Sequence, residues 1–542
     1  MEKFIKKTSN FIFSKQTSIF SSALLLSLMI VLTSFSGFLR YRVLSGYFDK
    51  EQLDIFFASF RIPDLIFEIL ITGALTTTFI PIYLRYKNNR KNLSVNISSI
   101  INFILLLLAA FIIVTAIFID RIIPIMTPGY SAEKTKIIID YSRLLLIGQL
   151  PFFVLGNFLT GIGQANKIFF LSALAPILYN LSIILTTVFF FQSFHLSAPI
   201  WGVVLGSFVL LLIQVPLISY SDFDYKLIIR KTQGLKDFIR LVVPRTFTII
   251  VAQIDATIDL TLATLLGGGA YTIFYFAQHL QLLPVSVIGI AFGQASLPYL
   301  TEIYRDKKIE EFKKIITDSI LNLLFLTVPI ALFFIFARTP LIRLFFGGQK
   351  FDWDATVQTA ITLSYFSVGI PFHAVYYLIT RCFYAIMDSR TPFFVGFFSI
   401  LINTCLSLLF VFLLKLPIWS LAIAFSASIS VNSVILFLIL SKKIKGFDFL
   451  GIIYSISKII ISGVLSAIFA YGTMKLLDGL VFQTLFTINV FFLLATTSII
   501  YLGLYLFICW ILNVKEIYLV TQLLLKAKEY QKRITEVYTQ HE

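Results

Sequence analysis

Long apolar segments, separated by clusters of charged residues and by Pro or Gly turns, recur along the whole chain. A helix of roughly 20 residues crosses a hydrocarbon core of about 30 Å, because it rises about 1.5 Å per residue. The pattern therefore predicts an all-α integral membrane protein with fourteen transmembrane helices. They are expected at about residues 18–39, 61–84, 97–119, 141–162, 168–191, 199–220, 240–265, 272–298, 316–337, 356–380, 391–414, 417–441, 455–475 and 484–511.

The composition narrows the class of protein further. Hydrophobic residues make up 58% of the 542-residue chain and charged residues only 13%, against roughly 25% in soluble globular proteins. These values exclude soluble, secreted, disordered and nucleic-acid-binding proteins. Three cysteines, Cys382, Cys405 and Cys509, lie in or beside apolar runs without metal-site spacing, so we expect them to be packing residues.

The net charge of +16 is explained by topology. Of the 44 Lys and Arg residues, 29 lie on the side of the membrane shared by the N-terminus, 12 on the other side and three inside predicted spans. By the positive-inside rule, both termini of this multi-pass protein are expected in the cytoplasm. The tail after Asn513 has the apolar and basic pattern of a short helix lying on the cytoplasmic surface.

Similar short motifs recur in the two halves of the chain at a nearly constant offset. Pro-Ile-Trp occurs at 199–201 and 417–419, and Pro-Phe occurs at 151–152 and 371–372. The agreement predicts a duplicated six-helix unit, whose two copies have the same orientation because six is even. We therefore expect an N-lobe (1–230), a C-lobe (231–446), two additional helices (447–512) and a cytoplasmic tail (513–542), with ligand bound between the lobes.

Charged residues at membrane depth identify a candidate site, because each costs about 2.5–3.5 kcal/mol unless it is paired or functional. Arg61 and Asp64 share one face of the second predicted span with Glu68. Arg40 and Arg42 end the first span, and Asp54 precedes the second. This group could hold an anionic ligand; alternatively, Arg61 and Asp64 simply neutralise each other.

A second group of polar residues lies on the seventh and eighth predicted spans. His279 follows Arg61 at the offset that separates the two Pro-Ile-Trp motifs, so the repeat would place both side chains toward the space between the lobes; a hydrogen-bonded packing role is the alternative. Asp255 and Asp259 are one helical turn apart on the seventh span, which also carries Arg245.

Asp259, together with Asn403 of the eleventh span, could bind a monovalent cation such as Na⁺, or Asp259 could take up a proton. Alternatively, Arg245 neutralises the aspartates. His373 and Lys458 are single polar residues for which a structural role is expected.

Enzymatic motifs are missing from the sequence. It has no phosphate-binding Gly-rich loop, no His/Cys metal spacing and no Ser-His-Asp order, and residues 267–269 (GGG) look like a plain turn. We expect no enzyme, no cofactor other than a coupling cation and no nucleic-acid partner.

A series of motifs runs in order through the first twelve predicted spans. They are 53–65 (LDIFFASFRIPDL), 73–74 (GA), 78–81 (TFIP), 127–130 (TPGY), 173–176 (ALAP) with Asn180, 344–347 (LFFG) with 351–352 (FD), 382–385 (CFYA) and 388–392 (DSRTP). The set resembles the signature of the MurJ (MviN) lipid II flippase family. The resemblance implies the multidrug/oligosaccharidyl-lipid/polysaccharide exporter fold, in which two six-helix lobes surround a cavity and two further helices form a groove for a lipid tail.

The resemblance extends to individual site positions. Arg40 and Asp54 match a family arginine and aspartate, and Arg61 stands where the family has Lys or Arg. The chain departs from the family pattern where Ser34, Phe67 and His279 replace arginines and Tyr41 replaces an acid. Arg245, absent from the family pattern, would restore one positive charge.

The expected function is translocation of a polyprenyl-pyrophosphate-linked peptidoglycan precursor, lipid II, across the bacterial inner membrane by alternating access. Its partners would be this lipid-linked saccharide, membrane lipids and cell-wall synthesis proteins. The alternatives are an O-antigen-type lipid-oligosaccharide flippase, a cation-coupled exporter and an inactive cell-wall scaffold. A membrane glycosyltransferase would need a catalytic extramembrane loop, and the sequence leaves only short loops between the predicted spans.

Overall fold

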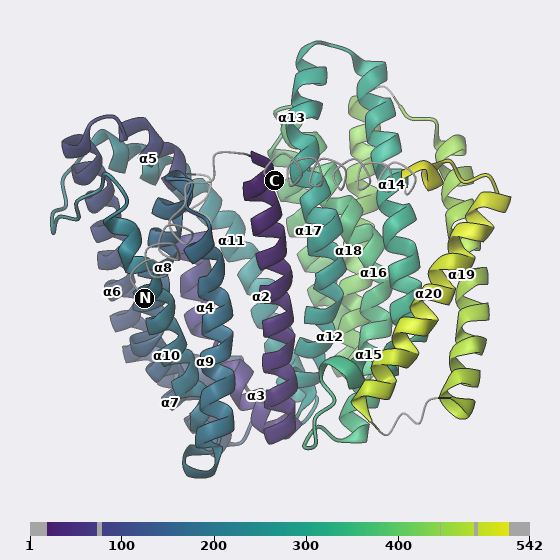
Figure 1. The fold of residues 1–542 in the computed structure, drawn as a ribbon, viewed down its shortest axis with the longest axis horizontal. Helices are drawn as coiled ribbons and strands as arrows, with labels where there is room; N and C mark the ends of the chain where they lie inside the picture. Colours follow the sequence, from purple (N-terminus) through teal and green to yellow (C-terminus); the bar gives the residue numbers. More distant parts are fainter. Residues whose placement is uncertain (1–18, 73–77, 445, 482–485, 520–542) are drawn as a thin grey trace, which may run out of the picture. The chain divides into compact units, whose positions relative to one another are not determined.

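The computed structural model describes residues 19–72, 78–444, 446–481 and 486–519, and over these ranges all regular structure is helical. The helices group into two compact units (Figure 1). Unit 1 comprises Met1–Thr272 and Phe345–Ala355, and unit 2 comprises Ile273–Leu344 and Thr356–Glu542. The grouping places the seventh predicted span with unit 1, whereas the sequence places the start of the C-lobe at residue 231; the functional lobes themselves stay a prediction.

Unit 1 contains the helices of the first seven predicted spans. They are α2 (Ile19–Tyr47), α3 (Lys50–Ser59), α4 (Arg61–Phe67), the π-helix η1 (Glu68–Thr72), α5 (Ile80–Tyr86), α6 (Arg90–Met126), α7 (Ala132–Gly148), α8 (Leu150–Ala165), α9 (Phe170–Phe194), α10 (Ser197–Gln214), the 3-10 helix η3 (Val215–Ile218) and α11 (Gln233–Leu265). Helix α9 packs against both α2 and α10, and α11 packs against α6. Figure 1 shows α6, α8, α9 and α10 as neighbouring long helices.

Unit 2 contains the remaining helices. They are α12 (Ala270–Pro284), whose first turn belongs to unit 1, the π-helix η4 (Val285–Ile290), α13 (Ala291–Arg305), α14 (Ile309–Phe336), α15 (Arg338–Phe345), α16 (Trp353–Ala385), α17 (Arg390–Leu408), the π-helix η5 (Leu409–Leu413), α18 (Trp419–Lys443), α19 (Phe449–Leu480), α20 (Thr487–Ile511) and the 3-10 helix η6 (Lys515–Ile517). Helices α19 and α20 lie side by side, and α14 packs against α19 (Figure 1).

Local capping explains where several helices begin. Asp49 and Gln52 form a capping box at the start of α3, in which each side chain bonds the other residue's backbone N–H. The side chains of Ser131, Thr232 and Asp448 likewise accept a backbone N–H at the starts of α7, α11 and α19. These caps are readable from sequence, because Ser, Thr and Asp precede apolar helices at each site.

Eleven helices in the described ranges are long and apolar enough to cross a membrane. The expected second, seventh and tenth spans are not among these eleven, so the count of fourteen is not confirmed. The second is divided between α4, η1 and α5, with residues 73–77 outside the described ranges. Helices α11 and α16 have 33 residues each, enough length to cross; several side chains of α11 lie outside the described residues, and His373 lowers the hydropathy of α16.

Backbone irregularities recur at the offset found in the sequence. The π-helices η1 and η4 begin at Glu68 and Val285, nearly as far apart along the chain as the two Pro-Ile-Trp motifs. Lys167 and Met387, separated by the same offset as the two Pro-Phe motifs, both have left-handed backbones, with φ of 63° and 61°, in the turns that end α8 and α16. In both turns the next residue donates its N–H to the carbonyl of the fifth residue before it, at 2.9 Å. The first and second halves of the chain thus share a π-helix and a left-handed turn at corresponding positions.

The segment between α10 and α11 is held along α6 by polar side chains. Ser94, Ser98 and Ser99 accept backbone N–H bonds of 2.9–3.1 Å from the segment. Asn102 donates to two of its carbonyls at 2.9 Å each. These bonds take the place of regular secondary structure, because the extended backbone here has no strand or helix partner. The connecting segment is therefore a docked strap, which we define as residues 222–232.

Candidate substrate-binding site

Charged and aromatic side chains of unit 1 form one electrostatic cluster. The Asp64 carboxylate lies close enough to interact with both Arg40 and Arg61. Tyr271, in the first turn of α12, interacts in the same way with Arg61 and with Asp259. The structure thus brings together residues that the sequence distributes over α2, α4, α11 and α12.

Arg61 is the best-defined member of this cluster. It is half-buried at the start of α4, and its guanidinium reaches α11. Nε donates to the Thr257 hydroxyl at 3.1 Å, and Nη2 donates to the Gln253 side-chain oxygen at 2.8 Å and to the Gln253 carbonyl at 2.5 Å. Nη1 makes no hydrogen bond with the described residues. Its two N–H groups are therefore available to an anionic ligand while the rest of the guanidinium fork is fixed.

The Arg61–Asp64 ion pair considered as an alternative is not formed. Within the described chain, no contact of 4 Å or less joins these two side chains, although their spacing on the helix would permit one. Asp64 is instead exposed, and Nε and Nη2 of Arg61 donate to neutral oxygens. A cation bonded to neutral groups keeps its full charge for a ligand, which favours the anion-binding hypothesis.

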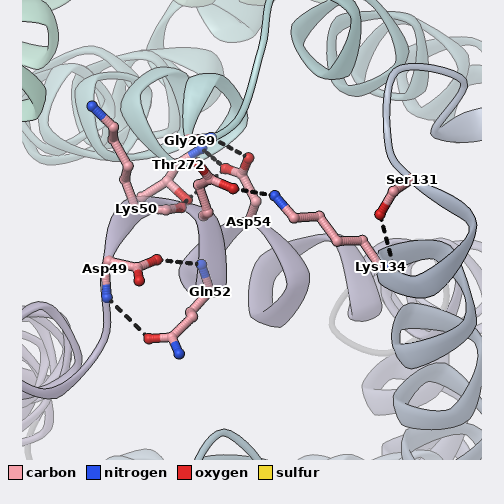
Figure 2. Close-up of polar contacts among 9 residues, drawn as sticks. Asp49, Lys50, Gln52, Asp54, Ser131, Lys134, Gly269 and Thr272 are labelled. Atoms are coloured by element: carbon pink, nitrogen blue, oxygen red, sulfur yellow. Dashed lines mark hydrogen bonds and ion pairs between the residues drawn. The ribbon is translucent and has the colours of Figure 1, made fainter.

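Asp54 caps the start of α12 (Figure 2). Its side chain is fully buried and accepts three hydrogen bonds of 2.7 Å, from the Gly269 N–H and from the N–H and hydroxyl of Thr272. Burial raises the pKa of Asp54 to about 6, although the bonds from Thr272 and Gly269 act in the opposite direction. Asp54 is thus ionised at neutral pH, and its charge stabilises the positive N-terminal end of α12. Its role in this structure is to position a helix.

The three glycines before α12 do more than turn the chain. Gly267 and Gly269 have positive φ values of 115° and 85°, which L side chains rarely adopt. A Cβ on Gly269 would lie 2.3 Å from the Lys50 side chain, and one on Gly268 would lie 2.6 Å from the Glu51 carboxyl carbon. The expected turn between the two helices is present, and it must approach α3 closely for Asp54 to reach its partners.

The surface of α3 carries an ion-pair network next to this cap. Lys50 lies 3.3 Å from Asp352 and 3.0 Å from Asp354, at the end of the 345–355 segment. Glu51 pairs with Lys134 of α7, and Lys134 is also drawn in Figure 2. The contacts explain why a segment that follows α15 in the chain belongs to unit 1. They are partly exposed, so each contributes only about 0–1 kcal/mol.

Arg40 and Arg42 both lie half-buried on α2. The Arg40 guanidinium carbon is 4.7 Å from the centroid of the Tyr41 ring, within the range of a cation–π contact. Arg40 belongs to the same electrostatic cluster as Arg61, because it interacts with the Asp64 carboxylate. The carbonyl of Arg42 accepts the Ser45 hydroxyl at 3.0 Å, and its ligand-binding role stays a prediction.

The two residues of the predicted cation site belong to different units. Asp259 is buried on α11 in unit 1, and Asn403 is buried on α17 in unit 2. Arg245 lies on α11, but its side chain is outside the described residues. Among the described residues, no group of three or more His, Cys, Asp or Glu side chains could hold a metal ion. A site built from one carboxylate and one amide stays a prediction.

His279 lies half-buried on α12 in unit 2. Its Nδ1 is 2.9 Å from the Tyr275 carbonyl, and the two rings are 3.9 Å apart at 32°. These contacts fit the packing alternative, while the expected pairing with Arg61 stays a prediction. His373 is buried against Tyr377, at a ring distance of 5.2 Å, as expected for a structural histidine.

Phe67 and Ser34 stand at positions where the resemblance implies arginines, and the structure shows what surrounds each of them. Phe67 packs on Phe153 of α8 at a ring distance of 4.8 Å, and Phe153 packs on Tyr179 of α9 at 5.6 Å. Mutually tilted aromatic rings therefore occupy the position where the resemblance implies an arginine. Ser34 is exposed on α2.

The sequence did not reveal which residues bond Arg61 and Asp54. Gln253 and Thr257 are one turn apart on α11, and nothing in their local pattern pointed to Arg61. Thr272 carried no signal either. A useful clue was the concentration of oxygen-bearing side chains within an otherwise apolar span.

A family model described as "Lipid II flippase MurJ" matches residues 44–493. The chain belongs to the MurJ family. It is 26% identical over 430 residues to the "Probable lipid II flippase MurJ" of Buchnera aphidicola subsp. Acyrthosiphon pisum, covering 77% of this chain and 82% of that relative. It is 26% identical over 441 residues to the "Lipid II flippase MurJ" of Burkholderia cenocepacia, covering 79% and 84%. The family expected from the motifs is confirmed.

Solved structures share the fold. "Lipid II flippase MurJ, inward closed conformation" matches with a TM-score of 0.74 at 24% identity, covering 90% of this chain and 98% of that structure. An inward-facing MATE family transporter of the MOP superfamily matches with a TM-score of 0.66 at 16% identity, covering 78% and 98%. The chain is therefore a multi-pass membrane protein with the helical fold that MurJ and MATE structures share.

Proposed function

We propose that this chain is a lipid II flippase, which moves a polyprenyl-pyrophosphate-linked peptidoglycan precursor from the inner to the outer leaflet of the bacterial cytoplasmic membrane. The family match over residues 44–493 and the curated relatives named as lipid II flippases support this substrate class. The activity is transport, because the family consists of flippases and not of catalysts.

The Arg61 guanidinium carries the binding part of the proposal. A pyrophosphate offers several anionic oxygens, and guanidinium N–H groups bind such oxygens in pairs. The two N–H groups of Nη1 diverge, so they would donate to oxygens of the two different phosphates while Gln253 and Thr257 hold the rest of the side chain. Arg40, which shares the Asp64 environment, would add a second positive charge, with Arg42, Arg245 and His279 as further ligand-binding candidates.

Alternating access would use the duplicated architecture. Two six-helix lobes, in parallel pseudo-repeat around a central cavity, would rock about the bound head group, and the C-terminal pair α19 and α20 would hold the lipid tail in a groove. The repeated Pro-Ile-Trp motif and the matched turns after α8 and α16 support the repeat. The distribution of Lys and Arg supports cytoplasmic N- and C-termini.

Transport would be driven by a coupling ion or by the membrane potential. A monovalent cation, Na⁺ or H⁺, would bind at Asp259 with Asn403 as an oxygen ligand. Asp259 is buried, and a bound cation or a proton would balance the charge of a buried carboxylate. Membrane potential acting on the head group is the competing source, at about 2.3 kcal/mol per charge per 100 mV.

Complementation tests the proposed function. The chain should restore growth and normal shape to a bacterium depleted of its own lipid II flippase, and should accelerate lipid II translocation in reconstituted vesicles. Rescue of a strain lacking an O-antigen flippase, without rescue of the lipid II strain, would instead favour a sibling lipid-oligosaccharide flippase. An inactive scaffold would produce no translocation in vesicles.

A further inference from the structure

A polar pocket of about 360 Å³ lies in unit 2, where the beginning of α19, the third and fourth turns of α14 and the chain after α20 meet. Its lining includes both positive and negative side chains: Lys458 and Lys515 on one hand, Asp318, Asp448 and Glu516 on the other. The pocket belongs to one compact unit and is separate from the Arg61 cluster of unit 1. Nothing in the proposed transport of a pyrophosphate-linked lipid uses it.

A turn after α20 brings part of this lining into place. Asn513 adopts a left-handed backbone with φ of 51°, and the Val514 N–H donates to the Cys509 carbonyl at 2.9 Å. Asn tolerates this conformation better than most residues, so the helix ends here in a Schellman motif. The turn buries Val514 against Phe325 and Ile459, and the following Lys515 and Glu516 line the pocket.

The pocket charges do not neutralise one another. Among the described residues, none of these five side chains forms an ion pair within 4 Å, although opposite charges line the same small volume. The Lys458 ammonium lies 4.5 Å from the centroid of the Tyr454 ring, a cation–π contact that leaves its N–H donors available. Asp448 already caps α19 through Gly451, which leaves Asp318 and Glu516 as acceptors.

The pocket lies next to apolar surface on helices that can cross a membrane. Lys458 lies in the third turn of α19, roughly 14 Å along the helix from its first residue, Phe449, at about 1.5 Å per residue. Nearby Ile453 and Trp510 are largely exposed apolar residues, on helices long and apolar enough to cross a membrane. Polar groups at a helix end, bordered by exposed apolar surface, suit an amphiphile better than a soluble ion.

We propose that this pocket binds the head group of a phospholipid that carries both a phosphate and a primary ammonium, as in phosphatidylethanolamine. Lys458, assisted by Lys515, contacts the phosphate. Glu516 and Asp318 accept hydrogen bonds from the ammonium, while the acyl chains lie against the apolar surface of α19 and α20. A separated pair of opposite charges in the ligand satisfies both signs in the pocket, whereas a free phosphate would leave the acids facing an anion.

Thermal unfolding of the purified, delipidated full chain in detergent tests this assignment. The probes are dioleoyl phosphatidylethanolamine, phosphatidylcholine, phosphatidylglycerol and inorganic phosphate. The variants are Lys458→Ala, Lys458→Arg and Glu516→Gln, with Lys442→Ala as a matched control, since Lys442 is an exposed lysine at the end of α18 outside the pocket.

Phosphatidylethanolamine should raise the Tm of the parent by a few degrees more than the other probes do, because only it supplies both a phosphate and an N–H donor. The difference should disappear in Lys458→Ala, and the preference over phosphatidylglycerol should shrink in Glu516→Gln. Lys442→Ala should behave as the parent. Lys458→Arg should keep most of the additional Tm shift caused by phosphatidylethanolamine. If Lys458→Ala does not fold, Lys458→Arg and Glu516→Gln still test the assignment.

Three results would overturn the proposal. Equal Tm shifts for all lipids in parent and variants would mean that no head group is selected. A stronger effect of phosphatidylglycerol would mean that the pocket recognises negative charge alone. A shift caused by inorganic phosphate and lost in Lys458→Ala would assign the pocket to free phosphate.

Discussion

At the scale of single residues, Arg61 shows how a membrane protein can retain a usable positive charge. An arginine at bilayer depth is costly unless its N–H groups find oxygen acceptors. Gln253 and Thr257 supply these acceptors without supplying a negative charge. The guanidinium is therefore both held in one orientation and left unneutralised by its direct partners, which is the combination that anion binding requires.

Replacing Arg61 should remove transport while leaving the protein folded. We expect Arg61→Ala to abolish complementation, because two charge-assisted hydrogen bonds to phosphate contribute about 1.5–3 kcal/mol each. Arg61→Lys should restore only part of the activity, since one ammonium cannot bond α11 and also offer the planar pair of donors. Growth of the depleted strain and lipid II flipping in vesicles are the measurements.

The control for this experiment is Arg121→Ala. Arg121 is an exposed arginine near the C-terminal end of α6, and it should be dispensable. Full activity of Arg61→Ala at normal expression would show that the cluster does not bind substrate.

Asp54 should make stability depend on pH. Its pKa is about 6 in the folded chain and near 3.8 in the unfolded one, so the folded state binds the proton more tightly. The contribution of Asp54 to the free energy of unfolding is then largest below about pH 4, falls as the pH rises to about 6 and is constant above; the full change is about 3 kcal/mol.

The measurement is the difference in Tm between the parent and Asp54→Asn from pH 4 to 7.5. We expect this difference to change between pH 4 and 6 and to be flat above 6.5. Asn should also lower Tm throughout, because its amide N–H₂ would face the Gly269 or Thr272 N–H donors. A pH-independent difference would mean that Asp54 keeps an ordinary pKa.

At the scale of elements, the strap of residues 222–232 depends on side chains of α6. Asn102 bonds the Lys226 and Ile228 carbonyls and accepts the Tyr225 hydroxyl at 2.5 Å. An extended backbone has no internal hydrogen bonds, so its order here comes from another helix. The Arg90–Asp224 pair, with two bonds of 2.8 Å, adds an exposed contact at one end of the strap.

Asn102→Ala should release the strap. Two carbonyls would lose their donor, at a cost of about 1–3 kcal/mol for each one left buried. We expect limited trypsin digestion to cut faster after Arg230 and Lys231, while the helices stay intact by circular dichroism. Asn92→Ala, an exposed asparagine on the same helix, is the matched control. Unchanged cleavage in Asn102→Ala would show that the remaining contacts suffice.

At the scale of the whole molecule, the main question is what drives transport. The relatives and structural matches concern transporters of one fold, and the ion dependence of this chain has to come from its own residues. Asp259 is a buried carboxylate on α11, within the same electrostatic environment as Tyr271 and Arg61. Its protonation or occupation by a cation would therefore affect the substrate cluster directly.

Asp259→Asn should weaken gradient-driven flipping. In vesicles with imposed sodium, proton or voltage gradients, we expect the variant to lose about tenfold in driven rate, which corresponds to roughly 1.4 kcal/mol. Asp222→Asn, an exposed acid outside the candidate spans, should match the parent. If Asp259→Asn keeps both its rate and its gradient dependence, voltage acting on the substrate charge is the better account.

The sequence by itself determined the class of protein, most of the spans and the family. Apolar runs, helix caps such as Asp49 with Gln52, and contiguous motifs such as residues 53–65 are local, so they can be read along the chain. It also identified the charged residues at membrane depth, because such residues are conspicuous in apolar segments. It overestimated the regularity of the second span, where the π-helix η1 follows α4.

The tertiary structure decided what those charges do. Arg61 finds its acceptors on Gln253, 192 residues away, and Asp54 finds Gly269, 215 residues away. The spacing of Arg61 and Asp64 permitted an ion pair, but α11 offered better acceptors. Lys458, a single lysine in the sequence, lines a pocket only because α14, α19 and the turn after α20 converge on it. Such contacts depend on how distant helices pack, and local periodicity carries no information about that packing.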